Sequence, residues 1–353
     1  MNTKTKVDTH INRVRLGSLS ADLEKSFESN VSLLLVGRPG VGKTAIVRDA
    51  WRKVAQRIGG DPEVVVDTPA CSDPTDYKGL PCVVDGHAVF DPIGLLRKLL
   101  GATTPTLFFL DDLGQASESI QKALQHIIWA REVEGRRIPD CVRFVGATNS
   151  RLDRAGVCNL ISPLVSRFDA VIHAEPDLEH WTSWGAENGI DSRILSFLQF
   201  KPDCFSQEPP QDFATKFGCP RAWEAVNKLL GQGLSSPAWL VGSLGSAGVD
   251  FHGFLAVYEG LADLPEKVLA SPKTARIPDL KKEPEVLWAL LGALVSRVKT
   301  PKHCESFFTY LPRLPQAFEV FGAKLFDKLC PKLRENKAFV DWTINRAHLV
   351  GLK

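Results

Sequence analysis

The sequence predicts an α/β fold with a parallel sheet, followed by an all-helical region. In the first 175 residues, short apolar runs typical of buried parallel strands alternate with segments whose apolar residues recur at helical spacing. After Pro176 the strand signals stop and one helical segment follows another. Strands that alternate with helices form a parallel sheet covered on both faces, so we expect such a sheet in the N-terminal half.

Five segments are expected to form the strands of this sheet. Each is a short apolar run, and together they cover residues 31–36, 63–67, 106–110, 142–147 and 170–173. Residues 20–30 favour a helix, with Ser20 as N-cap and Glu24 near the reciprocal capping position. Residues 44–58 favour a second helix, which Gly59 and Gly60 end.

The remaining helices divide the chain into regions. They are expected at residues 178–188, 191–200, 221–230 and 283–298, with Pro- and Gly-bearing turns between them. We expect an N-terminal arm (1–19), an α/β domain (20–176), a helical lid (177–236) and a helical C-terminal extension (237–353). Aromatic residues in the extension recur at helical spacing and are expected to form core.

Composition narrows the class of protein. The 353 residues carry 43 Lys and Arg against 41 Asp and Glu, a net charge of +2, which excludes a globally basic nucleic-acid binder but not a local basic patch. No apolar run approaches the length of a membrane span, and the N-terminus lacks the pattern of a secretory signal. The eight cysteines show no zinc-ligand spacing, so we expect buried thiols in a reducing compartment and a cytoplasmic protein without membrane contact.

A glycine-rich segment between the first expected strand and the second helix matches GxxxxGK[ST] at every fixed position. Its glycines would let backbone N–H groups approach phosphate oxygens, and the helix N-terminus would add positive potential. Lys43 would reach the β- and γ-phosphates of ATP, and Thr44 would hold Mg²⁺. The alternative is an ordinary Gly/Pro turn. The matching residues, all candidates for nucleotide binding, are Gly37, Arg38, Pro39, Gly40, Val41, Gly42, Lys43 and Thr44.

A second motif ends the third expected strand. Residues 107–110 are apolar and are followed by Asp111 and Asp112, which places two carboxylates at the carboxyl edge of the sheet, beside the phosphate loop. Asp111 would orient water on Mg²⁺, and Asp112 would polarise the attacking water as general base. Two acids at this position could instead cap the helix that follows.

These motifs resemble those of the AAA+ ATPases, and more closely the MoxR-like branch with an insert in the second helix, found in bacteria and phages. The resemblance covers roughly residues 20–245. Residues 71–81 are similar to the segment that leads into the insert, and 82–90, with Asp85-Gly86 at a turn, to its hairpin, which in the family projects toward a central pore. Residues 131–138 resemble the second family hairpin. The alternative for residues 82–90 is a surface hairpin without a substrate role, and the alternative for residues 131–138 is a solvated turn.

Three further residues receive roles from this resemblance. Asn149, after the fourth strand, matches sensor 1, which binds the attacking water or the γ-phosphate. Arg167 matches the arginine finger that reaches the nucleotide of a neighbouring subunit, with Arg151 and Arg154 as weaker candidates. Arg221 matches sensor 2, a γ-phosphate contact at the start of a lid helix. Each residue has an alternative role: Asn149 could simply cap the strand end, Arg167 could form a surface salt bridge, and Arg221 could lie at a helix N-terminus without a ligand.

The sequence also departs from the family pattern. Asp112 stands where the family usually has Glu, and its side chain is one methylene shorter, which favours slower hydrolysis. Gly114 and Gln115 replace an Asn-Arg pair common in MoxR relatives, so no role is carried over to them. Residues beyond about 245 match nothing in the family.

The resemblance implies an oligomer, commonly a hexamer, that couples ATP hydrolysis with Mg²⁺ to remodelling of a protein client, often with a von Willebrand A-type adaptor. Two alternatives stay open at this point. A nucleic-acid motor or loader is suggested by Arg136-Arg137 and the basic stretch Lys328–Lys337, although the near-neutral charge speaks against it. A slow-turnover ATP-dependent switch or scaffold is suggested by Asp112.

Overall fold

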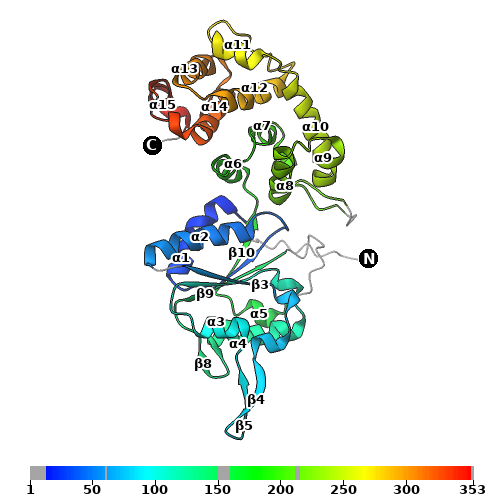
Figure 1. Cartoon of the computed structure of the whole chain (residues 1–353), viewed down its shortest axis with the longest axis vertical. Coiled ribbons are helices and arrows are strands. Elements are labelled where there is room, and N and C mark those ends of the chain that lie inside the picture. The colour runs from blue at the N-terminus through cyan, green and yellow to red at the C-terminus, as the bar shows by residue number, and fades with distance from the viewer. Residues whose placement is uncertain (1–12, 60–61, 150–159, 211–214, 351–353) are drawn as a thin grey trace, which may run out of the picture. The chain divides into compact units, whose positions relative to one another are not determined.

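The computed structural model of the chain describes residues 13–59, 62–149, 160–210 and 215–350. The chain divides into two compact units, residues 1–177 and residues 178–353 (Figure 1). The first unit is α/β, and in the described residues of the second unit the regular elements are all helices. The predicted fold class, an α/β sheet domain followed by helices, is confirmed.

A parallel sheet forms the centre of the first unit. It contains all five predicted strands, and a sixth strand at one edge makes it six-stranded rather than five-stranded. Neighbouring strands are parallel throughout. In spatial order the strands are β1 (Arg13–Arg15), β10 (Ala170–Glu175), β2 (Leu33–Val36), β9 (Val142–Thr148), β6 (Thr106–Leu110) and β3 (Glu63–Asp67).

The sixth strand lies in the segment predicted as an arm. β1 pairs with β10, with Arg13 opposite His173, and has a single apolar residue, so it lacks the hydrophobic run that marks the other strands. The first helix, α1 (Leu16–Glu28), follows at once with Arg15 at its N-cap. Ser20 is therefore not the N-cap, and its hydroxyl lies 3.4 Å from the Glu24 carboxylate inside the helix.

Helices cover both faces of the sheet (Figure 1). On one face, α1 and α2 (Lys43–Ile58) share a core with β2, β6 and β9. On the other face lie α3 (Gly94–Leu100), α4 (Glu118–Ala130) and α5 (Ser162–Val165). Every residue of β6 is buried because both of its faces are covered, which explains its unbroken apolar sequence.

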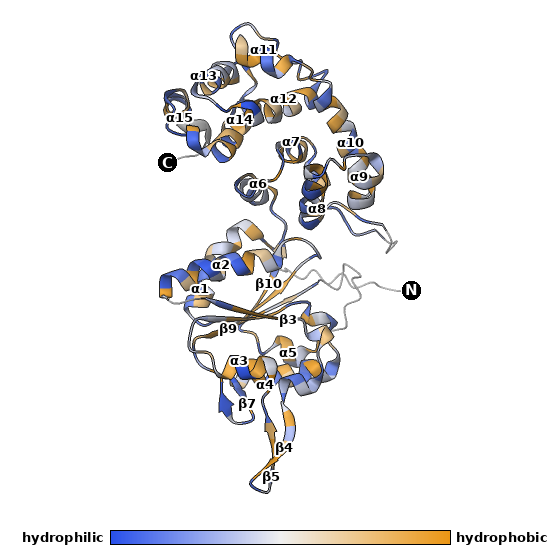
Figure 2. Cartoon of the chain, in the orientation of Figure 1, coloured by the Kyte–Doolittle hydropathy of each residue, from blue (hydrophilic) through white to orange (hydrophobic). Residues whose placement is uncertain are grey.

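A hairpin is present in the segment predicted as the insert, which is called the insert hairpin below. β4 (Leu80–Val84) and β5 (His87–Asp91) pair antiparallel. Asp85 (φ 53°) and Gly86 (φ 81°) between them are both left-handed, the conformation that a two-residue hairpin turn of this type requires. The hairpin is largely apolar and exposed; Val83 is 74% exposed (Figure 2).

A second, shorter hairpin lies in the segment 131–138. β7 (Glu132–Val133) pairs with β8 (Arg136–Arg137), and Glu134 (φ 48°) and Gly135 (φ 75°) form its turn. Arg137 forms an ion pair with Asp140 at 3.1 Å.

The second unit is built around one hydrophobic core. Buried residues from Trp181 to Trp342 belong to it, so the predicted boundary between lid and extension at residue 236 falls inside a shared core. Its helices are α6 (Leu178–Glu187), α7 (Ser192–Phe200), α8 (Pro220–Gly231), α9 (Pro237–Leu244), α10 (Ser246–Glu259), α11 (Leu264–Ala270), α12 (Pro284–Arg297), α13 (Pro301–Tyr310), α14 (Gln316–Leu329) and α15 (Lys337–Val350).

The cysteines only partly follow the expectation of buried thiols. All seven described cysteines are free, and Cys158 lies outside the described residues. Four are buried: Cys204, Cys219, Cys304 and Cys330. Cys71 is exposed, because it precedes the insert hairpin in a short surface turn.

We predict that a thiol-modifying reagent applied to the folded protein at pH 8 labels Cys71 first and leaves the four buried cysteines unmodified until the chain is unfolded. Burial raises the pKa of Cys204 to about 11 and that of Cys304 to about 12, which suppresses the reactive thiolate. Peptide mass spectrometry with and without denaturant checks this. Loss of the fast phase in Cys71→Ser is the control, and fast labelling of Cys304 in the folded state would contradict it.

Candidate active site

The candidate residues of the first unit gather at the carboxyl edge of the parallel sheet. The glycine-rich loop leaves β2, Asp111 and Asp112 follow β6, and Asn149 follows β9. β2, β9 and β6 are neighbours in the sheet, so residues far apart in the sequence meet at one edge. Ligands of open parallel α/β sheets bind at this edge.

Backbone geometry explains three glycines of the loop. Gly40 (φ 77°) and Gly42 (φ 107°, the N-cap of α2) adopt conformations that residues with a side chain rarely take. Gly37 donates its N–H to the Thr148 carbonyl at 3.2 Å. A β-carbon on Gly37 would lie 2.6 Å from the carbonyl oxygen of Ala174, so the loop can pass β10 only without a side chain there.

The Lys43 ammonium is buried among oxygen atoms. Its side chain is 7% exposed, and Nζ donates to the carbonyls of Gly37 at 2.7 Å and Arg38 at 3.0 Å. It also donates to Oδ1 of Asn149 at 3.0 Å. Asn149 is itself only 8% exposed. A lysine ammonium at the end of a glycine-rich loop is a suitable partner for phosphate oxygens.

The loop and the third strand are joined by a direct hydrogen bond. Thr44 Oγ1 donates to Oδ2 of Asp111 at 3.0 Å, and the other carboxylate oxygen of Asp111 accepts from the Asp112 N–H at 3.1 Å. A hydroxyl beside a carboxylate offers the hard oxygen ligands that Mg²⁺ prefers. Within the described residues, no cluster of three or more His, Cys, Asp or Glu side chains is arranged to hold a metal ion. The Thr44 hydroxyl and the Asp111 carboxylate would fit a cation whose other ligands come from phosphate and water.

Asp112 has an unusual backbone. Its φ of 51° is left-handed, and its Oδ1 accepts from Nδ2 of Asn149 at 3.3 Å. Among residues with a side chain, Asp and Asn tolerate this conformation best, because the short polar side chain can bond locally. The backbone thus gives a physical reason for an Asp at a position where the resembling family usually has Glu.

The described structure brings together Lys43, Thr44, Asp111, Asp112 and Asn149. Arg38 and Pro39 lie in the loop, and Val41 is buried in the core shared by α1 and α2. Arg151 and Arg154, the weaker finger candidates, lie outside the described residues.

Two further arginines have predicted roles. Arg167 directly follows α5, and its guanidinium stacks on the exposed ring of Trp129, with Cζ 4.9 Å from the ring centroid. Arg221 is exposed in the first turn of α8, after Pro220 at the first helical position, in the second unit. The roles of both stay predictions.

An acidic residue at the same edge was missed in the sequence. Asp67 ends β3, and its carbonyl accepts from the Asp111 N–H at 2.8 Å. Its carboxylate accepts from the Tyr77 hydroxyl at 2.5 Å and from Ser72 at 3.3 Å. Burial raises the pKa of Asp67, and these two hydrogen bonds oppose the rise. The apolar run of β3 ends in an acid, as the run before Asp111 does. This shared pattern is the sequence signal that could have identified Asp67.

We predict that Tyr77→Phe destabilises the protein by about 1–2 kcal/mol at pH 7 and by less at pH 4. The folded-state pKa of Asp67 lies above its unfolded value, so the charged carboxylate costs stability as pH rises. Tyr77→Phe removes the hydroxyl that donates to the Asp67 carboxylate, so the charged carboxylate costs more stability at neutral pH. At pH 4 the carboxyl is charged less often, and the loss is smaller. Urea unfolding at both pH values measures the difference.

Tyr310→Phe is the matched control for this experiment. The Tyr310 hydroxyl donates to the neutral carbonyl of Arg276 at 2.8 Å, so its loss should cost the same at both pH values. Equal losses at pH 7 and pH 4 for Tyr77→Phe would show that the charge of Asp67 is not involved.

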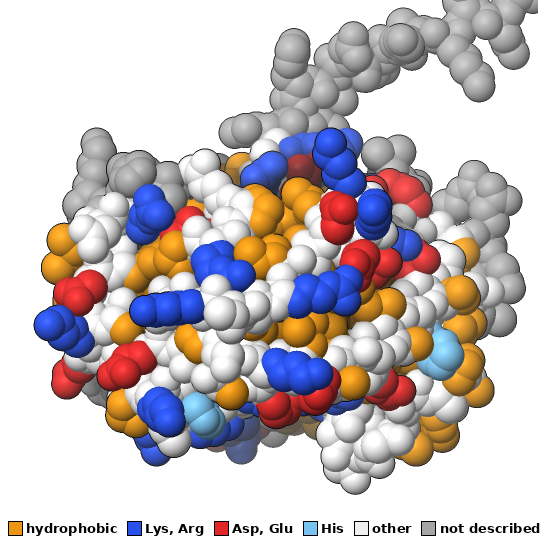
Figure 3. All heavy atoms as spheres, turned by 90° about the horizontal axis from the view of Figure 1, so that it is seen from above, with side chains coloured by type: hydrophobic (Ala, Val, Ile, Leu, Met, Phe, Trp, Pro, Cys, Tyr) orange, Lys and Arg blue, Asp and Glu red, His pale blue; other side chains and the backbone are white. Residues whose placement is uncertain are grey.

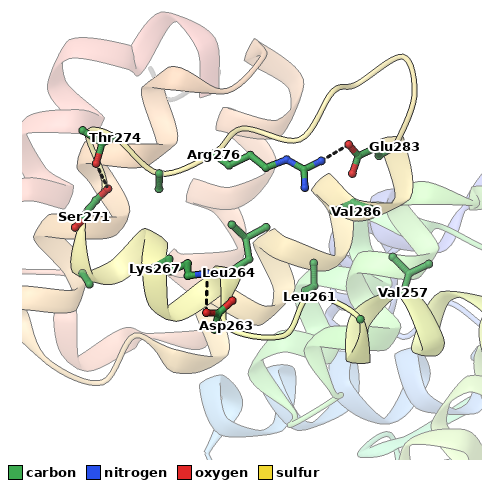
Figure 4. A pocket seen from close by; sticks show the side chains of 13 residues that line it. Val257, Leu261, Asp263, Leu264, Lys267, Ser271, Thr274, Arg276, Glu283 and Val286 are labelled. Carbon is green, nitrogen blue, oxygen red and sulfur yellow. Dashed lines mark hydrogen bonds and ion pairs between the residues drawn. The ribbon is translucent and has the colours of Figure 1, made fainter.

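The second unit contains a groove of about 790 Å³ between α10, α11 and the start of α12. Its floor is aliphatic, and its charged side chains face one another: Lys267 pairs with Asp263 at 2.7 Å, and Arg276 pairs with Glu283 (Figure 4). These pairs satisfy the charges locally. None of the candidate residues lines the groove.

No helix in the described part of the chain is both long and apolar enough to cross a membrane.

Comparison with known proteins identifies the nucleotide-binding part. Residues 32–168 match the family described as the AAA domain of the dynein-related subfamily. This span begins at β2 and ends after Arg167, so it includes every gathered candidate residue. Together with the parallel sheet and its order, the match shows an AAA+ P-loop fold in the first unit. No curated protein matches the chain.

Solved structures with some likeness to the chain include two AAA+ proteins. The RuvB Holliday junction branch migration motor of Thermotoga maritima is 17% identical, covers 73% of this chain and 74% of its own, and has a TM-score of 0.36. NtrX from Brucella abortus in complex with ADP is 14% identical, covers 94% and 68%, and has a TM-score of 0.34. At such identities and scores, neither likeness carries a functional conclusion for this chain.

Proposed function

We propose that the chain, whose residues 32–168 match the AAA domain, is an ATPase of the MoxR-like type that works as an oligomeric ring, commonly a hexamer, on a protein partner. One observation carries the proposal. Hydrogen bonds connect the phosphate loop with the two strands beside it, through Thr44 to Asp111 and through Lys43 to Asn149. These hydrogen bonds support a site in which the loop and both strand ends hold one nucleoside triphosphate.

The chain's own residues supply the hydrolytic chemistry in this proposal. Lys43 and the loop N–H groups bind the phosphates, while Thr44 and Asp111 hold Mg²⁺. When bound, Mg²⁺ neutralises charge on the phosphate oxygens. Asp112 accepts the proton of the attacking water, and Asn149, which contacts both Lys43 and Asp112, fixes the position of that water.

Two arginines would complete the site from outside this group. Arg167 would reach the nucleotide of a neighbouring copy and balance the charge of the transferred phosphoryl group. Arg221, exposed at the start of α8, would contact the γ-phosphate of its own chain and couple the second unit to the nucleotide. Since Arg167 acts on another copy, full activity requires an oligomer.

The exposed insert hairpin supports a protein as the client. Its strands β4 and β5 present Leu80, Val83, Val84, Val89 and Phe90 to solvent, an apolar surface suited to a polypeptide or an adaptor, such as a von Willebrand A-type domain (Figure 2). The seven free cysteines in the described residues fit a reducing compartment, so we place the protein in the cytoplasm.

Several of the charges that suggested a nucleic-acid motor are paired with acidic neighbours. In the basic stretch, Lys328 pairs with Glu187 at 2.7 Å and Arg334 with Asp327 at 2.9 Å. On the second hairpin, Arg136 lies 3.9 Å from Asp91. The face seen in Figure 3 likewise has acidic side chains among the basic ones. Nucleic acid is therefore the weaker candidate for the client.

We predict that Arg167→Ala lowers ATP turnover about a thousandfold or more while leaving ATP affinity within a few-fold, because a trans-acting finger stabilises charge that develops only in the transition state. Phosphate release at saturating ATP and Mg²⁺, with equilibrium nucleotide binding in parallel, measures both. Lys43→Ala is the control that should lose binding. Full activity of the parent protein in a verified monomer would refute the trans assignment.

A slow-turnover switch is the second candidate, suggested by the short Asp112 side chain where the resembling family usually has Glu. We predict that Asp112→Asn abolishes turnover and retains ATP binding, and that Asp112→Glu gives no gain, because Glu fits this backbone less well than Asp. Single-turnover rates compare the variants with the parent. A gain of tenfold or more in Asp112→Glu would favour the switch over the motor.

A further inference from the structure

An exposed tryptophan lies against the proposed finger. Trp129, in the last turn of α4, is 68% exposed, and the Arg167 guanidinium covers its ring with Cζ 4.9 Å from the centroid. A large aromatic side chain left this open to solvent on a single chain is typical of a surface that another molecule covers. The cation over its ring is the residue that the proposed function sends to a second copy.

The backbone on both sides of Arg167 is fixed. Leu164 and Phe168 are buried, and Phe168 packs where Gly146 of β9 leaves room, since a β-carbon there would lie 2.9 Å from the Phe168 ring. Asp169 accepts from the backbone N–H of Ser32 at 2.8 Å. The base of the finger is therefore rigid, and only its long side chain has freedom.

The helix that bears Trp129 is fixed to the same place. Gln121 of α4 accepts from the Ile161 N–H at 2.9 Å, which ties α4 to the start of α5. Ile127 and Ile128, beside Trp129, are buried in the core. The aromatic ring thus stands at a defined position relative to the Arg167 backbone.

The contact with the Trp129 ring leaves the N–H donors of the Arg167 guanidinium available for another partner. The guanidinium of Arg167 carries five N–H donors, and its contact with the Trp129 ring is a cation–π contact rather than a hydrogen bond to an acceptor. In the described part of the chain, no hydrogen bond or ion pair of this guanidinium is found. The Trp129 ring restricts the rotamers of the Arg167 side chain, which reduces the conformational entropy that Arg167 loses when it binds a nucleotide. The ring does this without accepting a hydrogen bond from the guanidinium N–H groups.

We propose that Trp129 is a positioning residue for trans hydrolysis: its ring holds Arg167 extended from one copy toward the nucleotide of a second copy, and the second copy covers the Trp129 and Arg167 surface. This inference rests on the proposed function. The site is incomplete without the partner, because the partner supplies Arg167, and Trp129 acts only through that arginine.

A mixing experiment tests the inference. One variant, Arg167→Ala, keeps its own site but donates no finger; the other, Asp112→Asn, donates a finger but has a dead site. Mixed oligomers are expected to recover part of the ATPase activity. Adding Trp129→Leu to the finger donor should lower kcat of the mixture about tenfold with the KM for ATP changed less than twofold, because Leu keeps apolar contact but offers no π-face.

Two controls sharpen the experiment. Trp129→Leu in the Arg167→Ala partner should leave the mixture unchanged, and Trp129→Phe in the finger donor should restore most of the rate, since a ring is again present. Light scattering at the assay concentration verifies equal assembly for all mixtures.

The outcomes distinguish failure of the trans arginine finger from failure of the positioning role of Trp129. If the parental mixture shows no recovered activity, the trans finger itself fails. If the mixture is active but Trp129→Leu has no effect in the finger donor, or the same effect in either partner, the positioning role of Trp129 is overturned and the finger stands.

Discussion

The structure of the site depends on three strands of one parallel sheet ending at the same edge. β2, β6 and β9 deliver the phosphate loop, Asp111 and Asn149 to within hydrogen-bonding distance of one another. A buried ammonium is costly unless acceptors surround it, and Lys43 finds three of them on two different strand ends. The sheet register therefore determines whether the lysine is tolerated, and the same register sets the geometry of the site.

Local sequence predicted the elements that carry a strong pattern of their own. The strand cores, the phosphate loop and both hairpin turns depend on residue types at fixed spacing, and their existence could be predicted. β1 could not, because three residues with one apolar side chain become a strand only when β10 is beside them. The Asp67–Tyr77 contact and the left-handed backbone of Asp112 arise from packing between distant segments, which no short window of sequence contains. The same holds for the pairing of Trp129 with Arg167.

The second unit shows where a boundary read from sequence has limited meaning. The Gly- and Ser-rich interruption before Pro237 separates two helices, but Trp223 on one side and Phe251 on the other pack edge to face with centroids 5.3 Å apart. A lid and its extension with a common core unfold and move together rather than separately.

Gly37 has a mechanical consequence beyond the space it leaves for the loop. Its backbone touches the end of β10 at Ala174, and only Pro176 and Asp177 separate that strand from α6, the first helix of the second unit. Any shift of the loop toward β10 would bring the Gly37 backbone against the end of that strand, so the two have to move together. The missing side chain thus couples the motion of the loop to a neighbouring strand of the sheet.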